Sequence, residues 1–68
     1  MPANYFLIYD TQTGLWLKTY STDLPQCTWG YSIEALHFDT QALADAAINS
    51  WSGGSQGGRF IGKNPPPR

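Results

Sequence analysis

The pattern of hydrophobic and polar residues predicts two strands near the N terminus, joined as a hairpin. Residues 5–9 (YFLIY) and 15–20 (LWLKTY) are rich in aromatic and branched side chains, a composition typical of strands. Between them, residues 10–14 (DTQTG) begin with an aspartate, which favours turns, and end with a glycine, which accepts positive φ. We therefore expect a β-hairpin with a loop of about four or five residues.

The next part of the chain predicts a loop followed by a third strand. Residues 21–30 (STDLPQCTWG) combine Pro25, Gly30 and small polar residues, which indicates a loop that carries one large ring, Trp29. Residues 31–35 (YSIEA) then alternate between apolar and polar side chains. This period of two favours a strand that runs on towards residues 36–38 (LHF).

A helix is predicted to begin at Asp39 and to end before Gly53. Asp39 is a good N-cap, and that choice places Phe38 and Leu43 at the spacing of a hydrophobic staple. Apolar residues at 43, 44, 47, 48 and 51 share one face, and polar residues occupy the opposite one. Gly53 and the glycine after it provide the left-handed positions that stop helices.

The C-terminal part predicts a glycine-rich connector, a short edge strand and an extended tail. Residues 53–58 (GGSQGG) are flexible, and residues 59–63 (RFIGK) suit the edge of a sheet. The prolines of residues 64–68 (NPPPR) cannot donate ladder hydrogen bonds. The expected class is α+β: one domain over residues 1–63 with order ββ(β)αβ, an antiparallel sheet of three to four strands and one helix on one face, followed by the tail.

One helix covers only one face of such a sheet, so the other face meets water or a partner. If the aliphatic residues and Phe6 lie under the helix, tyrosines and Trp16 gather on the outer face, and these residue types are common in interface hot spots. The predicted partner-binding residues are Tyr5, Tyr9, Trp16, Lys18, Tyr20 and Arg59. Two alternatives stay open: the 21–30 loop with Trp29 covers this face, or two copies of the protein form a homodimer through it.

Size and charge narrow the function classes. The chain has 68 residues, of which 41% are hydrophobic and 13% are charged, so we expect one ordered domain with no cleft between two lobes. A domain of this length has an expected radius of gyration of about 11 Å. The net charge of −1 argues against a nucleic-acid partner. Binding of single-stranded nucleic acid by aromatic stacking is kept as the alternative function.

The residues that carry chemistry are few. Cys27 is the single cysteine and His37 the single histidine, so the sequence predicts no disulfide, no metal site, no cofactor and no catalytic residue. A Cys27–His37 pair would need the loop and the strand end to meet. Residues 53–62 (GGSQGGRFIG) lack the preceding strand and the Lys-Ser/Thr pair of a phosphate loop. We therefore expect a protein that is not an enzyme.

The N terminus has no basic segment, and the apolar run at residues 5–9 is too short for a signal peptide or a membrane span. A cytoplasmic location without a membrane partner is the expectation.

Several short motifs resemble a type of small phage and prophage accessory protein. They are Tyr5-x-x-Ile8-Tyr9-Asp10, Gly14-x-Trp16-Leu17-Lys18, Trp29 in the following loop, and Ala35-x-x-Phe38 with Asp39-Thr40. Proteins of that type are ββ(β)αβ miniatures, and they include inhibitors of host defence such as anti-CRISPR proteins. The resemblance implies a non-enzymatic module, located in the host cytoplasm, that inhibits a host protein by occluding its surface. No functional motif of that group transfers residue by residue.

Overall fold

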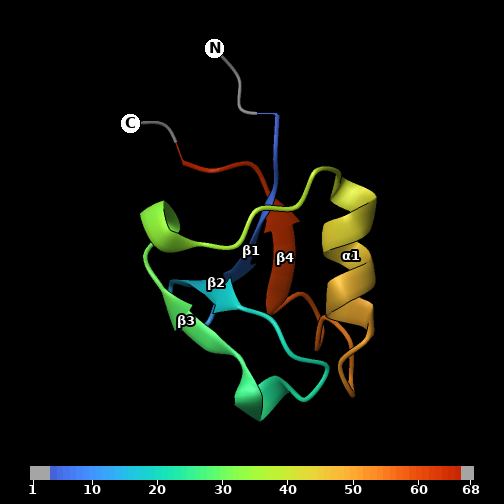
Figure 1. Cartoon of the computed structure of the whole chain (residues 1–68). Coiled ribbons are helices and arrows are strands. Elements are labelled where there is room, and N and C mark those ends of the chain that lie inside the picture. Colours follow the sequence, from blue (N-terminus) through green and yellow to red (C-terminus); the bar gives the residue numbers. More distant parts are fainter. Residues whose placement is uncertain (1–3, 67–68) are drawn as a thin grey trace.

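The computed structural model describes residues 4–66, which form an antiparallel sheet with one α-helix (Figure 1). The sheet has four strands in the order β3-β2-β1-β4. The elements, from the N terminus onward, are β1 (Leu7–Asp10), β2 (Leu15–Thr19), the 3-10 helix η1 (Leu24–Gln26), β3 (Thr28–Gly30), the 3-10 helix η2 (Ser32–Glu34), α1 (Gln41–Asn49) and β4 (Phe60–Lys63). The predicted α+β class is confirmed.

The hairpin forms where the turn residues predicted it. Tyr9 lies opposite Trp16 and Asp10 opposite Leu15, so β1 and β2 pair directly beside the loop. The Asp10 carboxylate accepts a hydrogen bond from the Gln12 N–H at 2.9 Å. Gly14 closes the loop with a φ of +77°, the left-handed conformation for which glycine is suited.

The prediction of a third strand from Tyr31 is wrong. The third strand is β3, which lies inside the expected loop and pairs with β2. Residues 32–34 instead form η2, in which the Glu34 N–H donates to the Tyr31 carbonyl and the Glu34 side chain returns to the Tyr31 N–H. These local bonds compete with a strand ladder, and an alternating sequence pattern does not reveal them.

After η2, residues 35–38 attach to both strands of the hairpin. The Leu36 N–H donates to the Leu17 carbonyl of β2 at 2.8 Å. Phe38 exchanges backbone hydrogen bonds with Phe6, just before β1, at 2.7 and 2.8 Å. In Figure 1 the light-green to yellow segment runs from η2 past β1 and β4 to the start of α1. The backbone therefore crosses the sheet once before the helix begins.

Helix α1 begins one residue later than predicted. Thr40, not Asp39, is the N-cap, and its hydroxyl accepts a hydrogen bond from the Leu43 N–H at 3.1 Å. The bridge between Phe38 and Phe6 keeps the backbone extended up to this point. Leu43 consequently lies in the first turn at 51% exposure, outside the buried stripe predicted for it.

The sheet buries side chains on both faces. On the helix side, Ile8, Leu17 and Phe60 pack against Ala44, Ile48 and Trp51, with Trp29 placed beside Phe60. On the other side, which we call the outer face, Leu7 and Trp16 pack with Ala35, Tyr5 and Tyr9. The predicted division of the first strand into two faces is confirmed. The alternative of a cover by the 21–30 loop with Trp29 is wrong, because Ala35 packs on the outer face while Trp29 packs in the core on the helix side.

Strand β4 is an edge strand, as predicted, and α1 partly covers that edge. The Gln41 amide donates to the Gly62 carbonyl at 2.8 Å. Residues 64–66 continue without helix or strand, and the last two residues of the predicted tail lie outside the described residues. No helix within residues 4–66 combines the length and the apolar character that crossing a bilayer requires.

Candidate functional site

Trp16, the predicted central anchor, is a core residue. Its side chain is 9% exposed and packs with Leu7 and Ala35. The neighbouring Tyr9 ring lies 4.5 Å from the indole, centroid to centroid, and is half-buried. The prediction that Trp16 stands on an exposed face is therefore wrong, because residues that follow η2 cover it.

Tyr20 lies on the helix side instead of the outer face. The pairing of β2 with β3 contains a register shift between Leu17 and Thr19, and such an irregularity reverses the side-chain alternation. As a result, the Tyr20 ring packs 6.1 Å from Trp51, and its hydroxyl is hydrogen-bonded to Ser50. The structure thus separates Tyr20 from Tyr5 and Tyr9, with which the prediction grouped it.

Lys18 is on the outer face, where it binds η2. Its ammonium lies 3.1 Å from one carboxylate oxygen of Glu34, and the other oxygen accepts from the Tyr31 N–H at 3.3 Å. The hydrogen bond from Lys18 lowers the pKa of Glu34, and the Tyr31 N–H adds to this effect. Gly30 leaves room for the pair, since a Cβ there would lie 2.6 Å from the Lys18 Cδ. Glu34 therefore fastens η2 to β2.

This turn presents the most exposed large hydrophobic residues among those described. Tyr31 is 73% exposed and Ile33 is 76% exposed, and Leu36, two residues after the turn, is 37% exposed. We call these three residues the η2 surface. The alternating pattern assigns Tyr31 and Ile33 to a strand, so sequence reasoning misses this site. A signal is present in Glu34, because a glutamate three residues after an N-cap is half of a capping box.

Further rings and one lysine line the outer face beside this surface. Tyr5 and His37 stack with centroids 3.9 Å apart and planes inclined by 13°. The Lys63 ammonium lies 5.2 Å from the Tyr9 ring centroid and 5.8 Å from that of Trp16, within the range of a cation–π contact. The binding roles of Tyr5, Tyr9 and Lys18 stay predictions.

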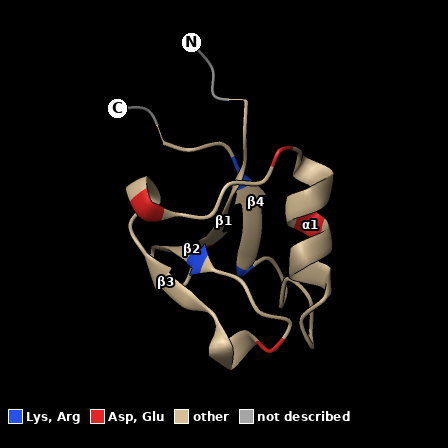
Figure 2. Cartoon of the chain, in the orientation of Figure 1, with Lys and Arg blue, Asp and Glu red and all other residues tan. Residues whose placement is uncertain are grey.

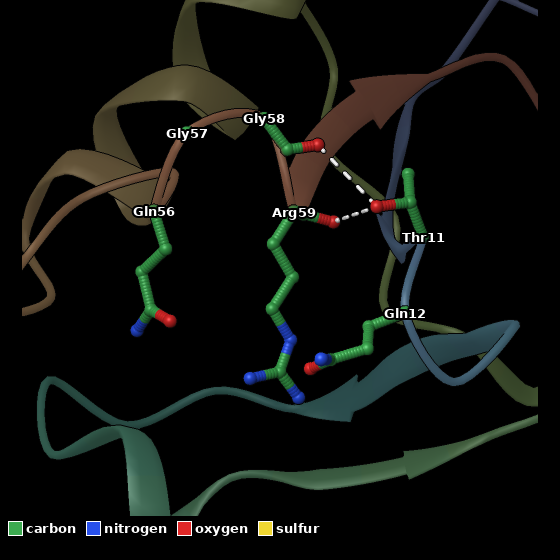
Figure 3. A pocket seen from close by; sticks show the side chains of 6 residues that line it. All are labelled: Thr11, Gln12, Gln56, Gly57, Gly58 and Arg59. Carbon is green, nitrogen blue, oxygen red and sulfur yellow. Dashed lines mark hydrogen bonds between the residues drawn. The ribbon is translucent and has the colours of Figure 1, made fainter.

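Arg59 lies in a separate polar depression of about 440 Å³ (Figure 3). The hairpin loop contributes Thr11 and Gln12, and residues 56–59 form the facing wall. The Arg59 Nε and Nη2 atoms donate to the two oxygens of Asp10 at 3.0 and 3.1 Å. This bidentate pair ties the residue before β4 to the end of β1.

The electrostatics of this pair favour both charged forms. Burial raises the pKa of Asp10, but hydrogen bonds from Arg59, from the Gln12 N–H and from Thr13, together with the Arg59 charge, outweigh burial and lower it. The hydrogen bond to Asp10 in turn raises the pKa of Arg59.

The two residues considered as a nucleophile and its base, Cys27 and His37, have different surroundings. Cys27 is buried on the helix side, where its thiol donates to the Ser21 carbonyl and accepts from the Ser21 N–H, both at 3.3 Å. His37 is exposed and stacks on Tyr5, beside the outer face. The structure does not bring them together. Among residues 4–66 there is also no cluster of three or more side chains that would suit a metal ion.

The described charges are distributed over the molecule (Figure 2). Lys18 lies on β2 and forms an ion pair with Glu34. Arg59 immediately precedes β4 and forms an ion pair with Asp10, and Lys63 lies at the other end of β4.

No family model matches the sequence, and no match was found among curated proteins or solved structures.

Proposed function

We propose that this protein is a non-enzymatic protein-binding module that acts by occluding the surface of a partner. The observation that supports the proposal is the η2 surface, in which Tyr31 and Ile33 are 73% and 76% exposed on a turn fastened at both ends. Glu34 fastens the turn to Lys18, and the Leu36 N–H fastens the following residues to β2. The residues proposed to contact the partner are therefore those of this turn, in place of Trp16 and Tyr20.

The physical argument is preorganisation. Large apolar side chains that remain in water gain free energy when a partner covers them, at about 25 cal/mol per Å² of apolar area. Ordering a flexible segment on binding normally offsets part of that gain. Here the Tyr31–Glu34 hydrogen bonds already order the backbone, so less of the gain is lost. Tyrosine is also among the residues that dominate interface energies.

The resemblance to short phage proteins supplies the class of partner within this proposal. An inhibitor of host defence needs a stable small scaffold and a surface that blocks a host protein, and it needs no catalytic group. A hydrogen-bonded turn that exposes Tyr31 and Ile33 beside a four-stranded sheet meets this requirement. The partner is then a protein of the host cell, and the inhibitor acts in the host cytoplasm.

The test compares capture of a partner by matched variants. We expect Tyr31→Ala combined with Ile33→Ala to reduce capture from a host-cell extract by at least about 2 kcal/mol, or roughly 30-fold, with unchanged thermal unfolding. Leu43→Ala is the control, because Leu43 is also an exposed aliphatic residue, at 51%, but lies on α1. Quantitative mass spectrometry of the retained proteins, with binding of the identified protein then measured by titration, gives the readout.

Equal capture by the double variant and the wild-type protein would contradict the proposal. A change in solution mass on the double substitution would instead assign the η2 surface to the homodimer alternative. Either conclusion requires that the double variant unfolds at the same temperature as the wild-type protein. We expect this, because both side chains are exposed and contribute little to the core.

A further inference from the structure

The Arg59 guanidinium has one edge bound and one edge free. A guanidinium carries five N–H groups in a planar fork, and a carboxylate binds bidentately along one edge of that fork. Asp10 occupies the edge formed by Nε and Nη2. Among the described residues, Asp10 is the ion-pair partner of Arg59, and none bonds to Nη1. From this geometry we infer that the second edge, Nη1 with the remaining N–H of Nη2, is a receptor for a carboxylate group of a ligand.

Asp10 holds the receptor in position. Its side chain is 4% exposed and accepts from the Gln12 N–H at 2.9 Å, so the carboxylate is fixed beneath the arginine. The guanidinium carbon also lies 4.9 Å from the Phe60 ring centroid. A free arginine loses rotamer freedom when it binds, whereas an arginine that is already held in one geometry loses much less.

The surroundings of the free edge suit a ligand with acceptor oxygens. Figure 3 shows the Gln56 and Gln12 side chains on either side of the Arg59 side chain: Gln56 extends alongside it, whereas Gln12 extends from the hairpin loop towards the guanidinium. Each amide group carries two N–H donors, which a ligand oxygen at the free edge can use once the amide turns its nitrogen towards it. A Cβ at Gly57 or Gly58 would meet no atom within 4 Å, so the wall above the guanidinium leaves space.

Two backbone carbonyls that would repel an anion are already engaged. The Thr11 hydroxyl lies 3.0 Å from the Arg59 carbonyl oxygen and 3.4 Å from that of Gly58. The Thr11 N–H also donates to the Arg59 carbonyl, at 2.8 Å. These bonds join the hairpin loop to the glycine segment and occupy both carbonyl oxygens, so that the free guanidinium edge of Arg59 is the group left for an incoming anion.

Charge balance selects a carboxylate over a more highly charged anion. Asp10 neutralises one positive charge, so the depression attracts its ligand through a bidentate hydrogen-bond geometry more than through net charge. A phosphate dianion would face the Asp10 carboxylate without help from Lys18 or Lys63, which lie elsewhere. The carboxylate can belong to an Asp or Glu residue or to the C terminus of a peptide. This site shares no residue with the η2 surface and does not depend on it.

The test is an NMR titration that includes the arginine Nε–H resonances. The probes are acetate, with acetamide and chloride as controls at constant ionic strength. We expect acetate to shift the Arg59 Nε–H and the Gly57 and Gly58 amides along a saturable curve, while acetamide and chloride do not. Comparing N-acetylglycine with N-acetylaspartate 1-amide then shows whether a C-terminal carboxylate or that of an aspartate binds more tightly.

Variants separate binding from structure. Gln12→Ala combined with Gln56→Ala leaves the Asp10–Arg59 pair intact and is expected to weaken acetate binding by about threefold or more. Gln26→Ala, an exposed glutamine on η1, is the matched control and should not change it. Arg59→Lys keeps the charge, loses the fork, and should abolish saturation. The inference is overturned if acetate shifts are linear, if chloride reproduces them, or if Arg59→Lys binds acetate as the wild-type protein does.

Discussion

At the scale of single residues, Asp10 has several structural roles. Its backbone pairs with Leu15 in the hairpin and with Phe60 in β4, and its carboxylate accepts from the Gln12 N–H and from Arg59. It is a buried charge that is paired, and such groups are costly to disrupt because the partner is left without compensation. The turn signal in the sequence accounted for the Gln12 contact, whereas the pairing with Arg59 joins residues 49 positions apart.

We expect Asp10→Asn to destabilise the fold by about 1–3 kcal/mol at pH 7, since it removes a charged hydrogen-bond acceptor. Because the folded state lowers the pKa of Asp10, its contribution is present above the ordinary value of 3.8 and is lost as pH falls through the lowered pKa. Urea unfolding between pH 7 and pH 2 measures this. The variant should lose less stability on acidification than the wild-type protein does.

Asp23→Asn provides the control for that experiment, because Asp23 is exposed and its carboxylate does not cap η1. Protonation of Glu34 also lowers the stability on acidification, because the pKa of Glu34 is lowered in the folded state too. Some loss of stability at low pH therefore remains in the Asp10→Asn variant. An identical pH profile for the Asp10→Asn and wild-type proteins would show that the Asp10–Arg59 pair does not contribute to stability.

At the scale of elements, two glycines mark where neighbouring segments approach closely. A Cβ at Gly30 would meet Lys18 Cδ at 2.6 Å and a Glu34 oxygen at 2.9 Å, which are ends of flexible side chains. A Cβ at Gly62 would meet the Cβ of Ala44 at 2.8 Å, and Ala44 is fixed in the buried face of α1. Replacement of each glycine by alanine therefore tests two kinds of contact: one with the ends of flexible side chains at Gly30, and one with a fixed helix residue at Gly62.

We expect Gly62→Ala to cost about 1–3 kcal/mol, because α1 must move away from β4. Gly30→Ala should cost less than about 1 kcal/mol and should displace the Lys18–Glu34 pair instead. Urea unfolding measures the first effect, and faster hydrogen exchange at the Glu34 amide reports the second. Equal destabilisation by both substitutions would mean that the Lys18–Glu34 contact is as rigid as the packing of α1.

At the scale of the whole molecule, the protein matches the size expected of one small domain. The radius of gyration is 11.0 Å, as the length predicted. Among the described cations, Lys18 and Arg59 are paired with Glu34 and Asp10, and Lys63 lies over the Tyr9 and Trp16 rings, so the charges that belong to the η2 turn itself, those of Lys18 and Glu34, cancel. Attraction to a partner there depends on apolar contact more than on charge.

Binding of the captured protein partner should therefore change less than about threefold between roughly 50 and 200 mM salt. The stacking alternative for single-stranded nucleic acid predicts a loss of roughly tenfold or more over that range if a few phosphates are neutralised. Isothermal titration at several salt concentrations, with the identified protein and with a single-stranded oligonucleotide, distinguishes the two. A steep salt dependence for the protein partner would contradict an apolar contact through the η2 surface.

Part of the candidate site was predictable from the sequence. The alternation of the first two strands assigns Lys18 and Tyr9 to the outer face, and the structure places them there. Tyr20 was misplaced because one irregularity in β2–β3 pairing reverses every later side chain, and no local pattern in the sequence announces it. Tyr31 and Ile33 were missed because a 3-10 turn and a strand both accept their spacing.

By itself, the sequence determined the elements whose signals are local: the hairpin with its Asp10 and Gly14 turn, the helix with its buried stripe, and the short edge strand before the tail. The tertiary structure alone decided β3, the N-cap at Thr40 and the exposure of each aromatic ring, and it selected the local Tyr31–Glu34 bonds of η2 over a strand. The Lys18–Glu34 pair, the Leu36–Leu17 hydrogen bond and the Phe6–Phe38 bridge hold η2, the segment after it and the residues before α1 against the sheet. Each of these contacts joins residues far apart in the sequence, and their free energies outweigh the preferences of the short segments between them.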